Sequence, residues 1–135
     1  MAEHFDIIVA GAGSAGMAAV KTIADSGASK RVLLLSNEDR LPYKRTKLSK
    51  HISSGFSNDE FSVADESWYK DHNIDLRTGT EAVSLDSDAR RLELATGESV
   101  EYGSLILAPG STPAFPPAVR EHPSDSYYFL RNAED

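Results

Sequence analysis

The sequence predicts an α/β fold in which a parallel β-sheet is covered by helices and an antiparallel β-meander is inserted into the chain. Two observations support this prediction. In the first part of the chain, short apolar runs alternate with helix-like segments, which is typical of parallel strands joined by helical crossovers. Further along, short segments are separated by turn residues, which is the pattern of an antiparallel meander. The 135 residues fit one domain.

The N-terminal residues show a strand–helix–strand pattern. Residues 5–10 (FDIIVA) and 31–36 (RVLLLS) are apolar runs, as expected of strands buried on both faces. Residues 17–26 between them are rich in small and apolar side chains, and Gly27 follows where a helix would end. A unit of roughly 30 residues is the size expected for two parallel strands and a helical crossover.

The middle of the chain is expected to be more irregular. A polar, basic loop is predicted for residues 37–47, a short helix for 47–54, a loop for 55–62, a helix for 65–72 and a brief strand for Ile74–Arg77. The meander is predicted as strands over residues 82–85, 91–95 and 100–102, followed by a separate buried strand, SLILA, over 104–108. Residues 127–130 (YYFL) form a last apolar patch.

Composition excludes several classes of function. The formal net charge of −7 argues against general nucleic-acid binding, which needs a basic face. The chain has no cysteine, which excludes disulfides and thiol chemistry, and its four histidines lack the spacing of metal ligands. We therefore expect no metal site. The chain shows neither a signal peptide nor an apolar run long enough to span a membrane, so we expect a cytoplasmic location without membrane association.

A glycine-rich turn follows the first strand and predicts a dinucleotide site. The first glycine permits the tight turn, the second lets a pyrophosphate approach the backbone, and the third lets the helix pack closely on the sheet. The pyrophosphate would then meet free N–H groups at the helix N-terminus. This context predicts a Rossmann-type fold, with the cofactor-binding turn formed by Gly11, Ala12, Gly13, Ser14, Ala15 and Gly16.

The ribose partner is expected at the end of the second strand, about 20 residues beyond the glycines. Ser36, Asn37, Glu38 and Asp39 occupy that position. An acidic side chain accepts hydrogen bonds from ribose hydroxyls, so Glu38 is the first candidate and Asn37 the second. The alternative interpretation is an exposed acidic loop. No serine, histidine and acid are arranged as a nucleophilic site, so we predict no catalytic side chain.

Several stretches together resemble the N-terminal part of the FAD-dependent pyridine-nucleotide oxidoreductases, most closely the ferredoxin and rubredoxin reductase branch and the apoptosis-inducing-factor group. The matching stretches are IIVAGAGSAGMAAV with the strand RVLLLS, LPYKRTKLSK at residues 41–50, TGTEAVSLD at 78–86 and LILAPGS at 105–111. The resemblance implies that Arg45 and Lys50 approach the flavin and its phosphates. It also implies that Ala82 meets the adenine edge, and that Ala108 and Gly110 lie near the pyrophosphate.

The sequence departs from the family pattern at several positions. Thr46 and Lys47 replace two prolines of the family pattern, so the loop that carries Arg45 is less rigid. Pro109 replaces a threonine and removes one N–H donor. The family continues into an NAD(P)-binding domain with its own glycine motif, and this sequence has no second glycine motif. The resemblance thus implies an incomplete domain, with residues 1–112 as the N-terminal portion of the FAD-binding domain and 113–135 as a connecting segment.

The resemblance implies a parent oxidoreductase in which FAD passes electrons from NAD(P)H to an acceptor such as a ferredoxin or rubredoxin. We expect the chain alone to be inactive. The alternative is a non-catalytic nucleotide-binding module or one subunit of a split enzyme. A third possibility is a scaffold whose Rossmann cleft binds no nucleotide. The basic residues of the loop, Arg40, Lys44, Arg45, Lys47, Lys50 and His51, fit a phosphate site, a docking patch for an acidic electron carrier, or a solvated surface. Apolar surface on SLILA and YYFL suggests a homo-oligomer.

Overall fold

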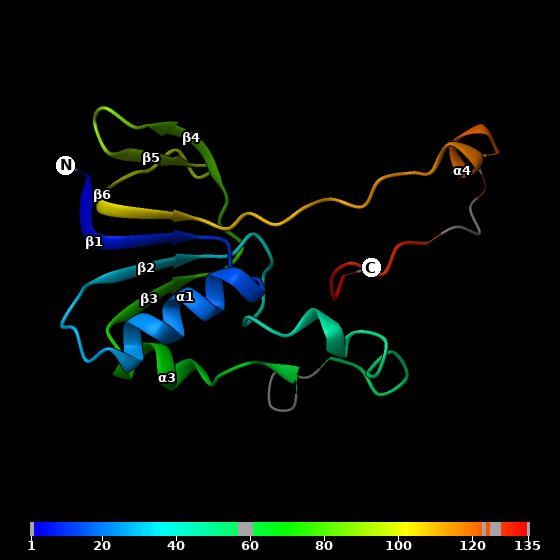
Figure 1. Cartoon of the computed structure of the whole chain (residues 1–135), viewed down its shortest axis with the longest axis horizontal. Coiled ribbons are helices and arrows are strands. Elements are labelled where there is room, and N and C mark those ends of the chain that lie inside the picture. Colours follow the sequence, from blue (N-terminus) through cyan, green and yellow to red (C-terminus); the bar gives the residue numbers. More distant parts are fainter. Residues whose placement is uncertain (1, 57–60, 123, 125–127, 135) are drawn as a thin grey trace.

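A computed structural model describes residues 2–56, 61–122, 124 and 128–134. Its main feature is a mixed sheet of six strands in the order β3-β2-β1-β6-β5-β4 (Figure 1). The strands of the described part are β1 (Glu3–Ala10), β2 (Val32–Leu35), β3 (Ile74–Arg77), β4 (Ala82–Asp86), β5 (Arg91–Leu94) and β6 (Ser99–Leu107). The helices are α1 (Ser14–Asp25), the 3-10 helix η1 (Arg45–Lys47), α3 (Glu66–Asp71) and α4 (Pro117–Glu121).

The predicted fold class is confirmed. Strands β3, β2, β1 and β6 run parallel, and β4, β5 and the first part of β6 form the antiparallel meander. The parallel strands end at one edge of the sheet, because Ala10 of β1 lies level with both Leu35 of β2 and Leu107 of β6. In open parallel sheets, ligands bind at this carboxyl edge.

Each face of the sheet is covered by an apolar cluster. Strand residues Val9 and Leu34 pack with Met17 and Val20 of α1 and with Tyr69 of α3 on one face. On the other face, Phe5 and Ile8 of β1 and Leu33 of β2 belong to one apolar cluster with Leu92 and Leu94 of the meander strand β5. Burying each such side chain contributes about 1.5–3 kcal/mol before the entropy cost of folding. The two clusters fix the strands, and therefore the loops at their carboxyl ends.

One predicted boundary is wrong. The sequence predicts separate strands over residues 100–102 and 104–108, but both segments belong to the single strand β6. Gly103, which separates them in the sequence, lies inside that strand. The first part of β6 pairs with β5 and nearly its whole length pairs with β1. A Cβ at Gly103 would lie 2.9 Å from the carbonyl oxygen of Asp6. The glycine therefore permits close approach of two strands rather than marking a turn.

Two helical predictions also need correction. Helix α1 begins at Ser14, so the last glycine of the turn lies inside its first turn. The helix expected over residues 47–54 is absent from the described chain; η1 ends at Lys47 and turns follow it. Tyr43, Leu48 and Phe61 anchor this segment as a small separate apolar cluster, and its backbone makes isolated turns, such as the bond from the His51 N–H to the Lys47 carbonyl oxygen, in place of a continuous helix. Residues 57–60 of the predicted loop and Tyr127 of the apolar patch lie outside the described residues.

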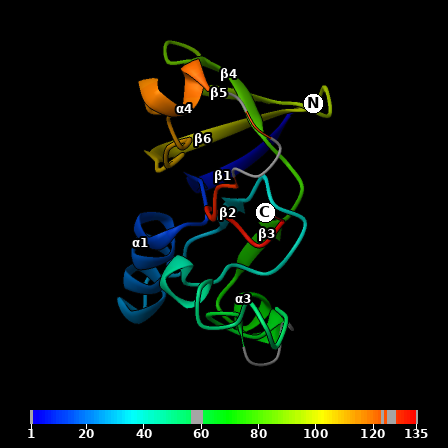
Figure 2. The same ribbon diagram turned by 90° about the vertical axis from the view of Figure 1, so that its right-hand side faces the viewer.

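The chain beyond β6 leaves the sheet and returns to it. It runs outward to α4 and comes back so that its last described residues lie beside the loop that follows β2 (Figures 1 and 2). Two hydrogen bonds hold the returning segment in place: the Arg131 carbonyl oxygen accepts from the Arg45 guanidinium, and the Ala133 N–H donates to the Tyr43 hydroxyl. We call residues 131–134 the return segment. None of the described helices is long and apolar enough to cross a membrane.

Candidate functional site

A cleft of about 320 Å³ opens at the carboxyl edge of the sheet. Its walls come from the glycine turn, the loop after β2, the loop after β6 and the return segment. The lining residues are Gly11, Ala12, Gly13, Ser14, Ala15, Ser36, Asn37, Glu38, Arg40, Leu41, Pro42, Tyr43, Arg45, Ala108, Pro109, Gly110 and Arg131. Most of the residues predicted from the sequence are thus brought together here, although their part in binding remains a prediction.

The three motif glycines have different structural environments. Gly11 has a φ of +116°, and a Cβ there would lie 1.9 Å from the carbonyl oxygen of Ala108. A Cβ at Gly16 would lie 1.8 Å from the carbonyl oxygen of Gly11. A Cβ at Gly13 would meet no atom within 4 Å. The first and third glycines therefore serve packing within the protein, whereas the second leaves open space at the cleft.

The N-terminus of α1 faces this open space. Gly13 is the N-cap residue, and no side chain caps the helix by hydrogen bonding. The first turn of α1 also contains no acidic residue. Backbone N–H groups at such a terminus, with the positive end of the helix dipole, favour an anion. This end of the 12-residue helix can therefore hold a phosphate group.

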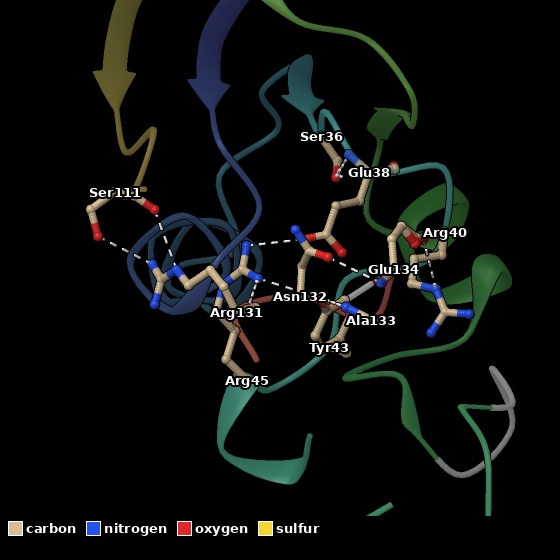
Figure 3. Close-up of polar contacts among 10 residues, drawn as sticks. All are labelled: Ser36, Glu38, Arg40, Tyr43, Arg45, Ser111, Arg131, Asn132, Ala133 and Glu134. Atoms are coloured by element: carbon tan, nitrogen blue, oxygen red, sulfur yellow. Dashed lines mark hydrogen bonds and ion pairs between the residues drawn. The ribbon is translucent and has the colours of Figure 1, made fainter. Parts of the chain in front are cut away.

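Glu38 is nearly buried beside the cleft, with 12% of its side chain exposed. Its backbone N–H donates to the Ser36 hydroxyl at 3.3 Å, which fixes the start of the loop. One carboxylate oxygen, Oε1, pairs with Arg45 at 3.0 Å (Figure 3). The other, Oε2, is buried and has no hydrogen-bond partner within the described part of the chain. A buried, unsatisfied acceptor is costly unless a ligand supplies a donor.

Tyr43 lies against the same ion pair. Its ring is buried and stacks on Phe61 with centroids 4.5 Å apart. Its hydroxyl accepts hydrogen bonds from Arg45 Nη1 at 3.3 Å and from the Ala133 N–H at 2.8 Å. Burial and, after it, interaction with the Glu38 carboxylate raise the pKa of Tyr43 to about 12. The hydroxyl therefore stays protonated over the physiological range.

The return segment closes one side of the cleft (Figure 3). Arg45 Nη1 donates to the carbonyl oxygen of Arg131 at 2.7 Å. The Arg131 guanidinium donates to the Ser111 backbone oxygen at 3.3 Å and to its hydroxyl at 3.4 Å. Arg40 pairs weakly with Glu134 at 3.8 Å. The loop after β2 and the loop after β6 are thereby joined through one short segment.

Arg131 was missed by the sequence analysis. It lies in the wall of the cleft, to which it adds a third arginine besides Arg40 and Arg45. Its contact with Arg45 joins residues 86 positions apart in the sequence. No local motif marks such a residue, because its position depends on where the chain returns after α4.

A second, smaller cavity of about 100 Å³ adjoins the cleft. Gly11, Asn37 and Pro109 line both spaces, and Ala82 lies in the wall of the smaller one. Ala82 thus shares a cavity with Gly11 of the glycine turn, and its contact with the adenine edge stays a prediction. The site therefore consists of the cleft and a smaller adjoining cavity with which it shares part of its lining.

Besides Ala82, two predicted residues lie outside the walls of the cleft. Gly16 lies beneath it, in contact with Gly11. Lys50 is exposed on the turns that follow η1 and does not line the cleft. The described residues contain no group of histidine, aspartate and glutamate side chains suited to a metal ion. Arg45 is the member of the predicted basic pair that reaches the site.

The chain is similar in sequence to known proteins. Residues 5–135 match the family model described as pyridine nucleotide-disulphide oxidoreductase. The human protein "Apoptosis-inducing factor 3" is 30% identical over 108 residues, which cover 80% of this chain and 18% of that protein. A ferredoxin–NAD(+) reductase subunit of the benzene 1,2-dioxygenase system from Pseudomonas putida is 32% identical over 111 residues, or 82% of this chain and 27% of that subunit.

Solved structures agree with the sequence relatives. The crystal structure of NADH:rubredoxin oxidoreductase from Clostridium acetobutylicum superimposes with a TM-score of 0.73 at 28% identity. The match covers 85% of this chain and 30% of that one. This chain thus spans less than a third of the length of each of these relatives.

Proposed function

This chain belongs to the pyridine nucleotide-disulphide oxidoreductase family, and on that premise we propose that it is the FAD-binding portion of an NAD(P)H-dependent flavoprotein oxidoreductase. The observation that carries the proposal is the open space at Gly13, in front of the uncapped N-terminus of α1. A pyrophosphate can approach this backbone without steric conflict, whereas side chains at Gly11 or Gly16 would collide with the protein itself.

The residues of the cleft fit the adenosine diphosphate half of FAD. The N–H groups at the start of α1 would hold the pyrophosphate, and the guanidinium groups of Arg45 and Arg131 would offset its charge. Glu38 has a buried, unsatisfied oxygen suited to a ribose hydroxyl. The smaller cavity beside Ala82 would take the adenine. Each group of the ligand thus meets a complementary part of the site.

Bound FAD would supply the redox chemistry, because flavins accept a hydride from a nicotinamide and pass electrons onward. The role of this chain is to bind and orient the cofactor through its adenosine half. NAD(P)H is the proposed electron donor of the parent protein. The proposed acceptor is a small carrier of the ferredoxin or rubredoxin kind, as named for relatives from Pseudomonas putida and Clostridium acetobutylicum.

An acidic carrier could dock near the exposed basic residues of the loop after β2. Lys44 and Lys50 are exposed there, on the same loop as Arg45 of the cleft. The rest of the chain is acidic overall, with a formal net charge of −7. A local basic patch on an acidic protein steers an acidic partner toward that patch and makes the association sensitive to salt.

The proposal is tested by calorimetric titration of the chain with FAD and with ADP, followed by anaerobic addition of NADH. We expect saturable binding of both ligands, and flavin reduction no faster than that of free FAD, because positioning a nicotinamide needs a second binding site. Rapid bleaching would mean that the chain is itself an active reductase. If neither FAD nor ADP binds, the proposed function is refuted.

A further inference from the structure

The hydroxyl of Tyr43 joins two parts of the chain that are far apart in sequence. It accepts one hydrogen bond from Arg45 Nη1 at 3.3 Å, within its own loop. It accepts a second from the Ala133 N–H at 2.8 Å, across a separation of 90 residues. The second contact is the shorter of the two and has a backbone donor, so it fixes the path of the return segment.

The ring of Tyr43 is held firmly, which makes its hydroxyl a fixed point. It is 6% exposed and lies in an apolar cluster with Leu48 and Phe61. The stacked contact with Phe61 constrains the plane of the ring. Replacement by phenylalanine would keep these apolar contacts and remove only the hydroxyl. The polar role of Tyr43 can therefore be tested apart from its packing role.

Arg45 links the Tyr43 hydroxyl to the carboxylate of Glu38, which lines the cleft. Its Nη2 pairs with Glu38 Oε1 at 3.0 Å, and its Nη1 donates to the carbonyl oxygen of Arg131 at 2.7 Å. The same Nη1 reaches Tyr43. Figure 3 shows these groups converging from the loop after β2 and from the return segment. A ligand that fixes Glu38 would therefore also fix the groups that hold residues 131–134.

We propose that Tyr43 is a positioning residue that couples nucleotide binding at Glu38 to closure of the return segment over the cleft. This inference rests on the proposed function, since the ligand is the adenosine diphosphate half of FAD. Coupling between two sites is reciprocal: a nucleotide stabilises the closed segment, and the closed segment raises nucleotide affinity to the same extent. Tyr43 lines the cleft, and its hydroxyl contacts Arg45 and the Ala133 backbone, through which the coupling would act.

The test measures the rate of hydrogen exchange at the Ala133 amide by NMR, with and without ADP, in the complete 135-residue chain. The variant is Tyr43→Phe. Its control is Tyr69→Phe, which also removes a buried hydroxyl, but one whose described contact is with the Met17 sulfur at 3.9 Å. We expect ADP to slow exchange about 5- to 10-fold in the parent and in Tyr69→Phe, and to have little effect in Tyr43→Phe.

Affinity gives the second measurement. Tyr43→Phe should weaken ADP binding several-fold, and Tyr69→Phe should not. If Tyr43→Phe does not fold, Ala133→Pro removes the same hydrogen bond from its donor side and should weaken ADP binding equally. ADP binding with equal protection of Ala133 in the parent and Tyr43→Phe would overturn the coupling while leaving the proposed function intact. Failure of the parent to bind ADP would overturn both.

Discussion

Gly16 packs against the backbone of Gly11 so closely that a Cβ on Gly16 would lie 1.8 Å from the Gly11 carbonyl oxygen. The first turn of α1 therefore rests directly on the turn that leaves β1. This contact fixes where the helix N-terminus points, and it leaves Gly13 between the two packed glycines with open space in front of it. The glycine motif thus contains two structural positions and one position that faces the ligand.

The first prediction separates these roles by substitution. Gly13→Val should abolish FAD and ADP binding, because its side chain would fill the space that a pyrophosphate needs. Its thermal stability should stay near that of the parent, since Gly13 has an ordinary φ of −79° and a Cβ there meets nothing within 4 Å. Titration calorimetry and thermal denaturation by circular dichroism measure the two effects.

Gly16→Val is the matched control for that experiment. It should lower the melting temperature strongly, because the new side chain overlaps the Gly11 carbonyl. Retention of FAD affinity by Gly13→Val would show that the phosphate site lies elsewhere.

The second prediction concerns the ribose. Glu38→Ala should weaken ADP binding by about 1.5–3 kcal/mol, the range for a hydrogen bond to a charged group. Asn37→Ala should cost less, because Asn37 is exposed and has no comparable buried acceptor. Calorimetry with ADP compares the two variants directly. An equal or reversed order of the two losses would place the ribose away from Glu38.

The sequence was sufficient for the parts of the fold and site that depend on local pattern. Glu38 follows directly from the end of β2 and its distance from the glycines, and the structure places it beside the cleft. Gly103 misled the prediction of β6, because a glycine that permits close strand approach looks like a turn in sequence. The roles of Tyr43 and Arg131 could not be predicted, since their contacts join residues 90 and 86 positions apart in the sequence. Such contacts depend on tertiary packing rather than on spacing.

The third prediction is a loss of stability at alkaline pH. The pKa values of Tyr43 and Tyr69 are raised from 10.0 to about 12, in both cases mainly by burial. A raised pKa means that the folded state retains a proton that the unfolded state releases, so stability falls as pH rises from 10 to 12. The contribution is fully present below pH 10.

Urea unfolding across this pH range measures the slope. Tyr43→Phe and Tyr69→Phe should each make the fall in unfolding free energy shallower than in the parent. Other groups titrate there as well, so the comparison between variants carries the test. An unchanged slope in both variants would mean that neither phenol is protected in the folded state.

The last prediction concerns the side of β6 that faces away from β1. Residues 104–107 pair with β1 on one side, whereas β5 pairs with β6 only at residues 99–101. No strand of the described chain pairs with the other side of residues 104–107, which carry no charge, and Leu107 is 59% exposed. An uncharged edge with free backbone groups favours pairing with another strand, so we expect the chain to self-associate as its concentration rises.

Leu107→Lys should weaken this association, because a charge at a strand edge opposes pairing. Ile52→Lys is the control, as it makes the same change of charge at a 65% exposed apolar residue outside the sheet. Sedimentation velocity over a concentration series distinguishes the variants, and association that both lysines leave unchanged would place the contact on another surface.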